Sequence, residues 1–179
     1  SRRKKRPQPS PARKKKAAPT TADTAAANPE VMLLGVEKVA DAMIKGMELV
    51  CEKGIKNVRF MDINAQELRE MFEQGEVERI FLNFSDPWPK ARHAKRRLTY
   101  WKFLEIYRQL LGKGGRLRFR TDNKDLFEFS LEEFAETGLK IVQLTRDLHN
   151  STVVNEVQTE YEEKFSAKGN KIYFVEVEF

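Results

Sequence analysis

The sequence holds a single cysteine, Cys51, and only two histidines, His93 and His149, in 179 residues. One cysteine cannot form an internal disulfide, so the composition favours a reducing compartment, and we expect a cytoplasmic protein. With so few cysteine and histidine ligands, we expect no metal site of the zinc type. Apolar runs are also short. The longest, 31–36 (VMLLGV), falls far below the roughly 20 residues that a membrane-spanning helix needs.

Acidic residues are absent from positions 1–20, which carry nine Lys or Arg. Removing these nine from the net charge of +6 leaves about −3 for the remainder, so a basic surface on the folded part must be a local patch. Proline, serine and like charges without aromatic residues cannot bury enough apolar surface to order a chain. We therefore predict a disordered basic leader over 1–27 and one domain over 28–179. The leader either holds RNA phosphates or is merely unstructured, and the second interpretation is favoured.

Strand and helix patterns alternate from residue 28 onwards. Strands are predicted at 31–36, 57–61, 79–84, 116–121, 140–145 and 171–179. Helical patterns follow at 39–53, 66–72, 100–111, 125–136 and 159–165. This alternation predicts an α/β fold built from βαβ units, with a mostly parallel twisted sheet and helices on both faces. In such sheets ligands bind beyond the carboxyl ends of the strands, so the residues that follow each strand are the candidates for chemistry.

Two polar residues follow the first two predicted strands. A carboxylate at Glu37 can accept both ribose hydroxyls of a nucleoside, or it can be an ordinary acid stabilised by the start of a helix. The amide of Asn64 can pair with an adenine edge, or it can cap a helix, and alone the cap is the better interpretation. The two roles of Asn64 are compatible, because a cap position there faces the ligand crevice.

The third predicted strand leads into Asp86-Pro87-Trp88-Pro89-Lys90, which is the most specific signal in the chain. The two prolines fix two φ angles and restrict the residues before them. Trp88 offers a flat ring that can stack on a base. A rigid loop with an acid, an indole and a lysine suits a planar substrate. The alternative is a proline-rich loop with Trp88 packed in the core.

A basic segment, 90–97 (KARHAKRR), has five Lys or Arg in eight residues and no acid. Such a run is usually a solvated face, but here it adjoins the candidate loop, which favours a phosphate-binding patch for nucleic acid. Asp122 follows the fourth predicted strand, and 159–162 (TEYE) adds two carboxylates and a phenol. A carboxylate can accept the N1–H and N2–H of guanine. Each of these acids can equally be a cap or turn residue.

In this order the residues resemble the bacterial tRNA (guanine-N7)-methyltransferase family over 21–179. The motifs that carry the resemblance are LGVEK (34–38), NFSDPWPK (83–90), RHAKRRLTY (92–100), FRTDN (119–123) and TEYEEKF (159–165). The resemblance implies a Rossmann-like fold, S-adenosylmethionine as cofactor and methylation of N7 of guanosine 46 in the tRNA variable loop. Family members act as monomers or as homodimers.

The resemblance also implies roles for individual positions. Glu37, Asn64 and Asp86 match cofactor-binding positions, and Asp86 also matches the proposed catalytic position. The positions that match substrate-binding residues are Lys90, Asp122, Thr159, Glu160, Tyr161 and Glu162. The positions that match the RNA-contacting segment are Arg92, His93, Ala94, Lys95, Arg96 and Arg97.

The sequence departs from the family in one respect. The family has a first strand and a glycine-rich loop before the segment that matches here, whereas this chain has no glycine before Gly35. The N-terminal part of the sequence is incomplete or misread, a second chain supplies the strand, or the protein is an inactive relative. The first explanation is favoured, because the other site residues are kept.

Two other functions compete with the methyltransferase. A non-catalytic RNA-binding relative without cofactor would explain the missing glycines. A nicotinamide-dependent oxidoreductase would explain Glu37 but lacks the G-x-G-x-x-G fingerprint.

Overall fold

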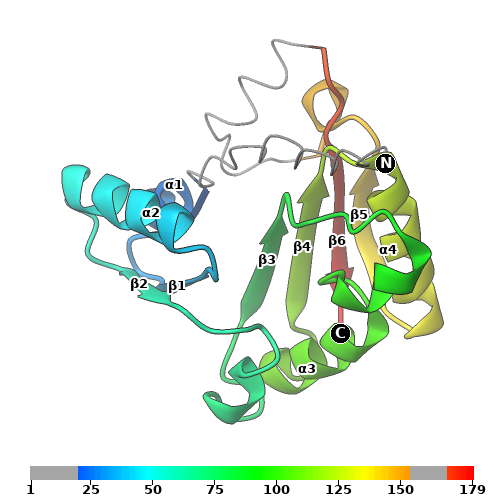
Figure 1. The fold of residues 1–179 in the computed structure, drawn as a ribbon, viewed down its shortest axis with the longest axis horizontal. Coiled ribbons are helices and arrows are strands. Elements are labelled where there is room, and N and C mark those ends of the chain that lie inside the picture. The colour runs from blue at the N-terminus through cyan, green and yellow to red at the C-terminus, as the bar shows by residue number, and fades with distance from the viewer. Residues whose placement is uncertain (1–19, 154–168) are drawn as a thin grey trace, which may run out of the picture.

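A computed structural model describes residues 20–153 and 169–179, and within them the strands form two separate sheets (Figure 1). One sheet has the order β1-β2 and the other β3-β4-β6-β5. The elements are α1 (Thr20–Ala27), β1 (Leu33–Val36), α2 (Ala40–Glu52), β2 (Val58–Met61), η1 (Leu68–Glu70), β3 (Arg79–Asn83), η2 (Ala91–Arg96), α3 (Trp101–Leu111), β4 (Arg116–Thr121), α4 (Lys124–Glu136), β5 (Lys140–Thr145), η3 (Leu148–Asn150) and β6 (Tyr173–Glu178).

The smaller sheet pairs β1 and β2 in parallel, and α1 packs beside it. Ala22 and Ala25 of α1 are buried, and the Asn57 side chain donates to the carbonyls of Ala25, Asn28 and Val31 at 2.8–3.0 Å. These bonds tie the end of α1 to the start of both strands. The segment 20–27, predicted as part of a disordered leader, is therefore helical. Its alanines favour a helix and are small enough to approach the strands closely. Positions 1–19 lie outside the described residues.

Helix α2 lies over the small sheet differently from the sequence prediction. The helical pattern predicted at 39–53 places apolar residues on one face, which in a core helix would be buried, yet Val39 and Met47 are each 46% exposed and only Ala42 is buried. Gly46 instead lies against Phe60, whose ring would come within 3.1 Å of a β-carbon there. A two-stranded sheet offers too little apolar area to cover a full helix face, so much of the stripe meets water.

The larger sheet contains both strand directions. β3 and β4 are parallel, whereas β6 runs antiparallel to both β4 and β5. The Rossmann-like α/β class predicted from the sequence is confirmed. The larger sheet is mixed, whereas a mostly parallel sheet was predicted, because two of its three pairings among the described strands are antiparallel.

One face of the larger sheet carries the main core. Alternate residues of β4 and β6 point to this face, where they meet the apolar sides of α3 and α4. The fully buried members are Leu104, Tyr107, Leu117, Phe119, Phe127, Phe134, Val175 and Val177. Among the described elements both long helices of this unit share that face, whereas the sequence predicted helices on both. The antiparallel return of β6 removes the crossover that would place a helix on the other side.

The opposite face carries a ladder of paired charges. Arg116 lies opposite Glu178, and Arg118 lies opposite Glu176. Arg116 bonds both glutamates, at 2.7 Å for Glu178 and 3.1 Å for Glu176. Arg118 also pairs with Glu176, and both of these side chains are nearly buried. The alternation of apolar and charged residues in RLRFRT thus places Leu117 and Phe119 on the core face and the arginines on the other.

The chain passes once between the two sheets, from β2 to β3 (Figure 1). The residues that pack this connection onto the core of the larger sheet are Ala65, Leu68, Phe72 and Val77. Gly75 then meets Gly112, the positive-φ residue that ends α3, so closely that a β-carbon on Gly112 would lie 3.2 Å from the Gly75 α-carbon. No described helix is long and apolar enough to cross a membrane.

Candidate functional site

The ends of β1 and β2 meet through Glu37, Lys38 and Asn64. The Glu37 amide donates to the carbonyl of Met61, which joins the two strand ends. Glu37 Oε1 accepts the amides of Lys38 and Val39, both at 2.9 Å, at the start of α2. Lys38 Nζ donates to Asn64 Oδ1 at 2.6 Å. The structure therefore brings two of the predicted cofactor residues to one place, with Lys38 between them.

The loop after β3 holds backbone conformations that side chains rarely adopt. Phe84 and Trp88 are the two positive-φ residues other than glycine in the described chain, at 53° and 43°. They lie on either side of Asp86, which is half-buried. Non-glycine residues held in this region cost of order 1–3 kcal/mol each and cluster at functional sites. The strain falls in the loop that the sequence analysis selected.

Arg97 holds this loop in place. Its Nε donates to the Pro87 carbonyl and its Nη2 to the Trp88 carbonyl, both at 3.1 Å. The same guanidinium lies 4.2 Å from the centroid of the Phe129 ring on α4. Arg97 was predicted to contact RNA, and this stays a prediction, because the bonds within the protein use only its Nε and Nη2. A planar fork with fixed donors is suited to two adjacent carbonyls, which is why this arginine turns inward.

The other members of the predicted RNA segment divide into two groups. Arg96 lies 4.8 Å from the Trp88 ring centroid, and His93 meets the same ring edge-on at 5.8 Å. Lys90, Arg92 and Lys95 are exposed, and Ala94 contributes the carbonyl that accepts the Arg97 amide. One face of Trp88, the predicted stacking surface, is thus already covered by a cation. The exposed members form a basic rim outside the loop.

Asp122 follows β4, whose end lies beside the end of β3. Asn83 is in register with Arg120, and the Phe84 amide donates to the Arg120 carbonyl at 2.9 Å. The capping of α4 is done by Asn123, whose Oδ1 accepts the Leu126 amide at 2.8 Å. Asp122 is therefore not the helix cap. Within the described residues its carboxylate forms no hydrogen bond or ion pair.

The predicted substrate residues Thr159, Glu160, Tyr161 and Glu162 lie outside the described residues.

Two polar residues near Asp86 were not among the predicted site residues. Asn83 Oδ1 and Ser85 Oγ are buried and find no hydrogen-bond partner among the described residues. Burying such a group without a partner costs about 1–3 kcal/mol, so natural proteins rarely leave them unless something else binds there. Both belong to the NFSDPWPK motif, and no sequence signal marks which of its polar atoms lack a partner.

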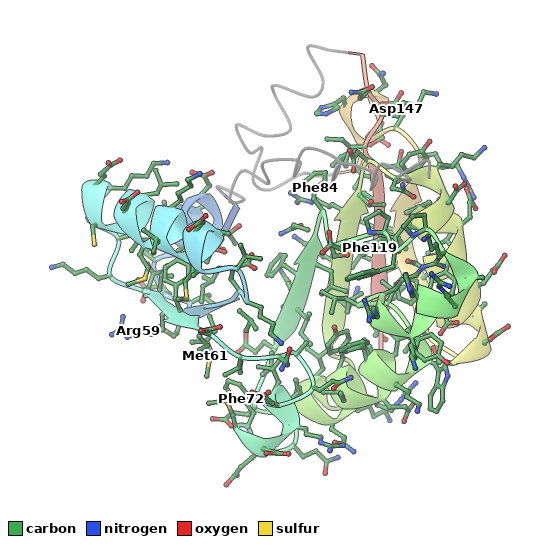
Figure 2. All side chains as sticks on the ribbon, viewed as in Figure 1. Arg59, Met61, Phe72, Phe84, Phe119 and Asp147 are labelled. Carbon is green, nitrogen blue, oxygen red and sulfur yellow. The ribbon has the colours of Figure 1, made fainter. Side chains whose placement is uncertain are left out.

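The two pairs of site residues lie in different units. Glu37 and Asn64 follow the strands of the small sheet, whereas Asp86 and Asp122 follow neighbouring strands of the larger one. Met61, at the end of β2, and Phe84, at the end of β3, are well apart (Figure 2). No hydrogen bond or ion pair joins the two pairs within residues 20–153 and 169–179. The structure thus assembles two half-sites rather than one closed crevice.

A buried glutamate positions the helix that follows the basic segment. Glu133 of α4 accepts the Trp101 amide at 2.5 Å, at the first residue of α3. Burial raises the pKa of Glu133, and the hydrogen bond from the Trp101 amide partly opposes that rise. The carboxylate at a helix N-terminus is stabilised by the helix dipole. It therefore fixes where α3 begins relative to α4.

Comparison with known proteins agrees with this architecture. A family model described as "Putative methyltransferase" matches residues 18–175. The tRNA (guanine-N(7)-)-methyltransferase of Geobacillus sp. (strain WCH70) is 47% identical over 157 residues, which are 88% of this chain and 71% of that protein. The protein of the same name from Bacillus subtilis (strain 168) is 48% identical over 152 residues, which are 85% and 71% of the two chains. A solved methyltransferase homolog protein from Pyrococcus horikoshii has a TM-score of 0.57 at 13% identity, over 82% of this chain and 53% of that one, which shows a shared fold.

The mixed α/β architecture and the polar strand ends are those of a Rossmann-like methyltransferase. The similarity to the curated relatives is closer than fold alone. The chain belongs to the bacterial tRNA (guanine-N7)-methyltransferase family. S-adenosylmethionine is the cofactor of such enzymes.

The residues present fit this cofactor at two places. The amides of Lys38 and Val39 both donate to Glu37 Oε1. Its other oxygen, Oε2, accepts no hydrogen bond within the described residues, so it can accept one from a ligand. The buried, unpartnered oxygens of Asn83 and Ser85 suit a ligand that donates hydrogen bonds, such as an α-ammonium group.

Proposed function

We propose that this protein transfers the methyl group of S-adenosylmethionine to N7 of a guanosine in tRNA, at position 46 of the variable loop. The observation that carries the proposal is the strained loop around Asp86. It is held by Arg97, bears two unpartnered buried oxygens and lies beside the strand end that carries Asp122. The names of the relatives supply the substrate class. The exposed free thiol of Cys51 supports a reducing compartment such as the cytoplasm.

The half-site of β1 and β2 would hold the nucleoside of the cofactor. Glu37 would accept the ribose hydroxyls through Oε2, and Asn64 would meet the adenine edge after Lys38 releases its Oδ1. Asp86, with Asn83 and Ser85, would hold the methionine end. A ligand that bonds both half-sites would bind best when they approach each other.

The half-site of β3 and β4 would hold the guanine. Asp122 would accept the N1–H and N2–H of the base, and Lys90 would lie on a phosphate. The residues at 159–162 would add further acceptors. Lys90, Arg92 and Lys95 form the basic rim that would receive the tRNA backbone. Arg96 would lie beside it over Trp88, with His93 and Ala94 shaping the segment.

The chemistry needs no general base. S-adenosylmethionine would supply an electrophilic methyl group: guanine N7 would give its lone pair to the methyl carbon while the carbon–sulfur bond breaks and its electron pair stays on sulfur. The carboxylates of Asp86 and Asp122 would stabilise the positive charge that passes to the purine. The protein's contribution is alignment and the exclusion of water, which together can lower a barrier by several kcal/mol. Asp86 thus orients and stabilises rather than removing a proton.

The test is transfer of labelled methyl groups to unmodified tRNA, followed by mapping of N7-methylguanosine by chemical cleavage. We expect a single product at position 46. Asp86→Asn should lower kcat at least tenfold with little change in tRNA affinity, whereas Asp125→Asn, an exposed acid of α4, should leave both unchanged. Equal losses of turnover and tRNA affinity in Asp86→Asn would contradict its role.

A second candidate function is tRNA binding without catalysis. The separation of the two half-sites in the structure favours it. Calorimetry with S-adenosylhomocysteine separates the two functions, because the methyltransferase must bind it and the binding module must not.

A further inference from the structure

A small hollow opens beside the basic rim, away from the strand ends. It has a volume of about 180 Å³ and lies between the loop after β2 and α3. The residues that line it are Gln66, Lys95, Tyr100, Lys102, Phe103 and Ile106. Nothing in the proposed chemistry uses it. Sites that enclose a whole small molecule usually measure about 300–1,000 Å³, so this hollow suits one part of a larger ligand.

The floor of the hollow is apolar. Phe103 and Ile106 are buried in the core of the larger unit, and Tyr100 is half-buried above them. The Trp101 ring lies 5.8 Å from that of Tyr100 and is 44% exposed, which is high for so large an apolar group. Flat apolar surfaces of this kind accept a base or a ribose, because every nucleotide has such a face.

The rim of the hollow is cationic. Lys95 and Lys102 are exposed on its border, and Lys102 Nζ lies 5.4 Å from the Trp101 ring centroid. No acid lines it. The nearest carboxylate on α3, Glu105, pairs with Arg108 at 3.5 Å, and Glu133 is occupied by the Trp101 amide. The lining residues therefore offer a polyanion two lysines and no carboxylate.

We infer that this hollow is a second RNA contact, at which a nucleotide places its base or ribose against Tyr100 and Phe103 while Lys95 and Lys102 bind the flanking phosphates. The site extends the basic rim from η2 onto α3, so one RNA strand can follow both. The inference rests on the proposed function for the identity of the RNA. Its ligand is a single-stranded or looped segment, since stacked bases inside a duplex do not present their faces.

The experiment measures tRNA affinity against salt concentration by filter binding, with Lys102→Ala and a matched control. Lys113→Ala removes an equally exposed lysine from the turn between α3 and β4. We expect Lys102→Ala to weaken binding about three- to tenfold near 0.1 M salt and to reduce the slope of log K against log salt by about 0.7. The control should keep the wild-type affinity and slope.

A second measurement uses tryptophan fluorescence to test contact beside the hollow, where the Trp101 ring lies next to Tyr100. The chain has two tryptophans, Trp88 and Trp101. If a nucleotide lies beside Trp101, tRNA should quench its fluorescence, and Trp101→Phe should lose that part of the quenching while Lys102→Ala weakens it.

Several outcomes would overturn the inference. They are wild-type affinity and slope in Lys102→Ala, equal losses in Lys113→Ala, quenching in Trp101→Phe that is as large as in the wild type, and binding of poly-glutamate as tight as that of tRNA. Failure of the proposed function gives a different result: the wild-type protein would then transfer no methyl group, while the effects of Lys102→Ala on tRNA binding would persist.

Discussion

The guanidinium of Arg97 donates a hydrogen bond to the main-chain carbonyl of Trp88 at 3.1 Å. Residues nine positions apart are thereby locked together, and the backbone of Trp88 is kept at a positive φ of 43°. The second bond of the same side chain, to Pro87, fixes its orientation. A basic residue of the segment next to the candidate site thus shapes the loop rather than the surface.

Arg97→Ala should therefore lower the free energy of unfolding by about 2–3 kcal/mol, because two hydrogen bonds from a charged donor are lost. Urea denaturation measures the change. Arg92→Ala, at an exposed position of the same segment, should stay within about 0.5 kcal/mol of the wild type. If both variants unfold alike, the loop does not depend on Arg97.

Ser85→Ala should separate stability from function. The Ser85 hydroxyl has no partner in the described structure, so its removal should leave the free energy of unfolding unchanged or slightly higher. If the hydroxyl binds a reactant, kcat/KM should fall about tenfold, as for one lost hydrogen bond.

The matched control for Ser85 is Ser130→Ala. The Ser130 hydroxyl lies 2.7 Å from both Thr99 Oγ1 and the Leu126 carbonyl. Its loss should destabilise the protein by about 1–2 kcal/mol and leave turnover of the folded enzyme unchanged. If Ser85→Ala instead lowers the free energy of unfolding and leaves kcat/KM unchanged, the Ser85 hydroxyl has a structural role.

Glu133 should give the protein a pH-dependent stability. Because burial raises its pKa in the folded state above the ordinary 4.5, the folded protein binds this proton more tightly than the unfolded chain. The stabilisation is complete below pH 4.5 and is lost as pH rises through the folded value. Glu133→Gln keeps an acceptor for the Trp101 amide but cannot titrate. The difference in unfolding free energy between wild type and Glu133→Gln should therefore fall with rising pH across that window. A difference that stays flat between pH 4 and 7 would contradict the raised pKa.

The two glutamates of the charge ladder, Glu176 and Glu178, should contribute unequally to the free energy of unfolding. Glu176 is 5% exposed and pairs with Arg116 and Arg118, so Glu176→Ala removes charge-assisted hydrogen bonds to two arginines in a nearly buried place and should cost about 2–3 kcal/mol. Glu178, at the more exposed end, pairs only with Arg116 among the described residues, and Glu178→Ala should cost about 1 kcal/mol or less. Chemical denaturation of the two variants compares them directly.

Much of the larger unit could be predicted from the sequence. The predicted bounds of β4 and β5 match those observed, and the helix predicted at 100–111 appears as α3, which ends at Leu111. In these segments local pattern and tertiary packing agree, since the stripe of α3 and the alternation of β4 both face one core. The family and its cofactor also followed from the motifs.

The small unit and the site were less predictable, for a physical reason in each case. The stripe of α2 is apolar as a core helix should be, but a pattern does not say how much surface is available to cover it. The short helix α1 depends on the side chain of Asn57, more than thirty residues away. The inward turn of Arg97 and the unpartnered oxygen of Ser85 depend on which atoms lie within about 3 Å, and residue type does not specify that.

The connection between the two sheets has one further consequence. From Ala65 onwards it is packed onto the larger core, and up to Met61 it belongs to β2, so residues 62–64 are the link between the two units in the described chain. Asn64, the proposed adenine partner, is the last residue of that link. A molecule held by Asn64 at one end and by the Asp86 loop at the other would join the two units directly. Binding of this molecule and alignment of the two half-sites would then be linked, so that each would favour the other.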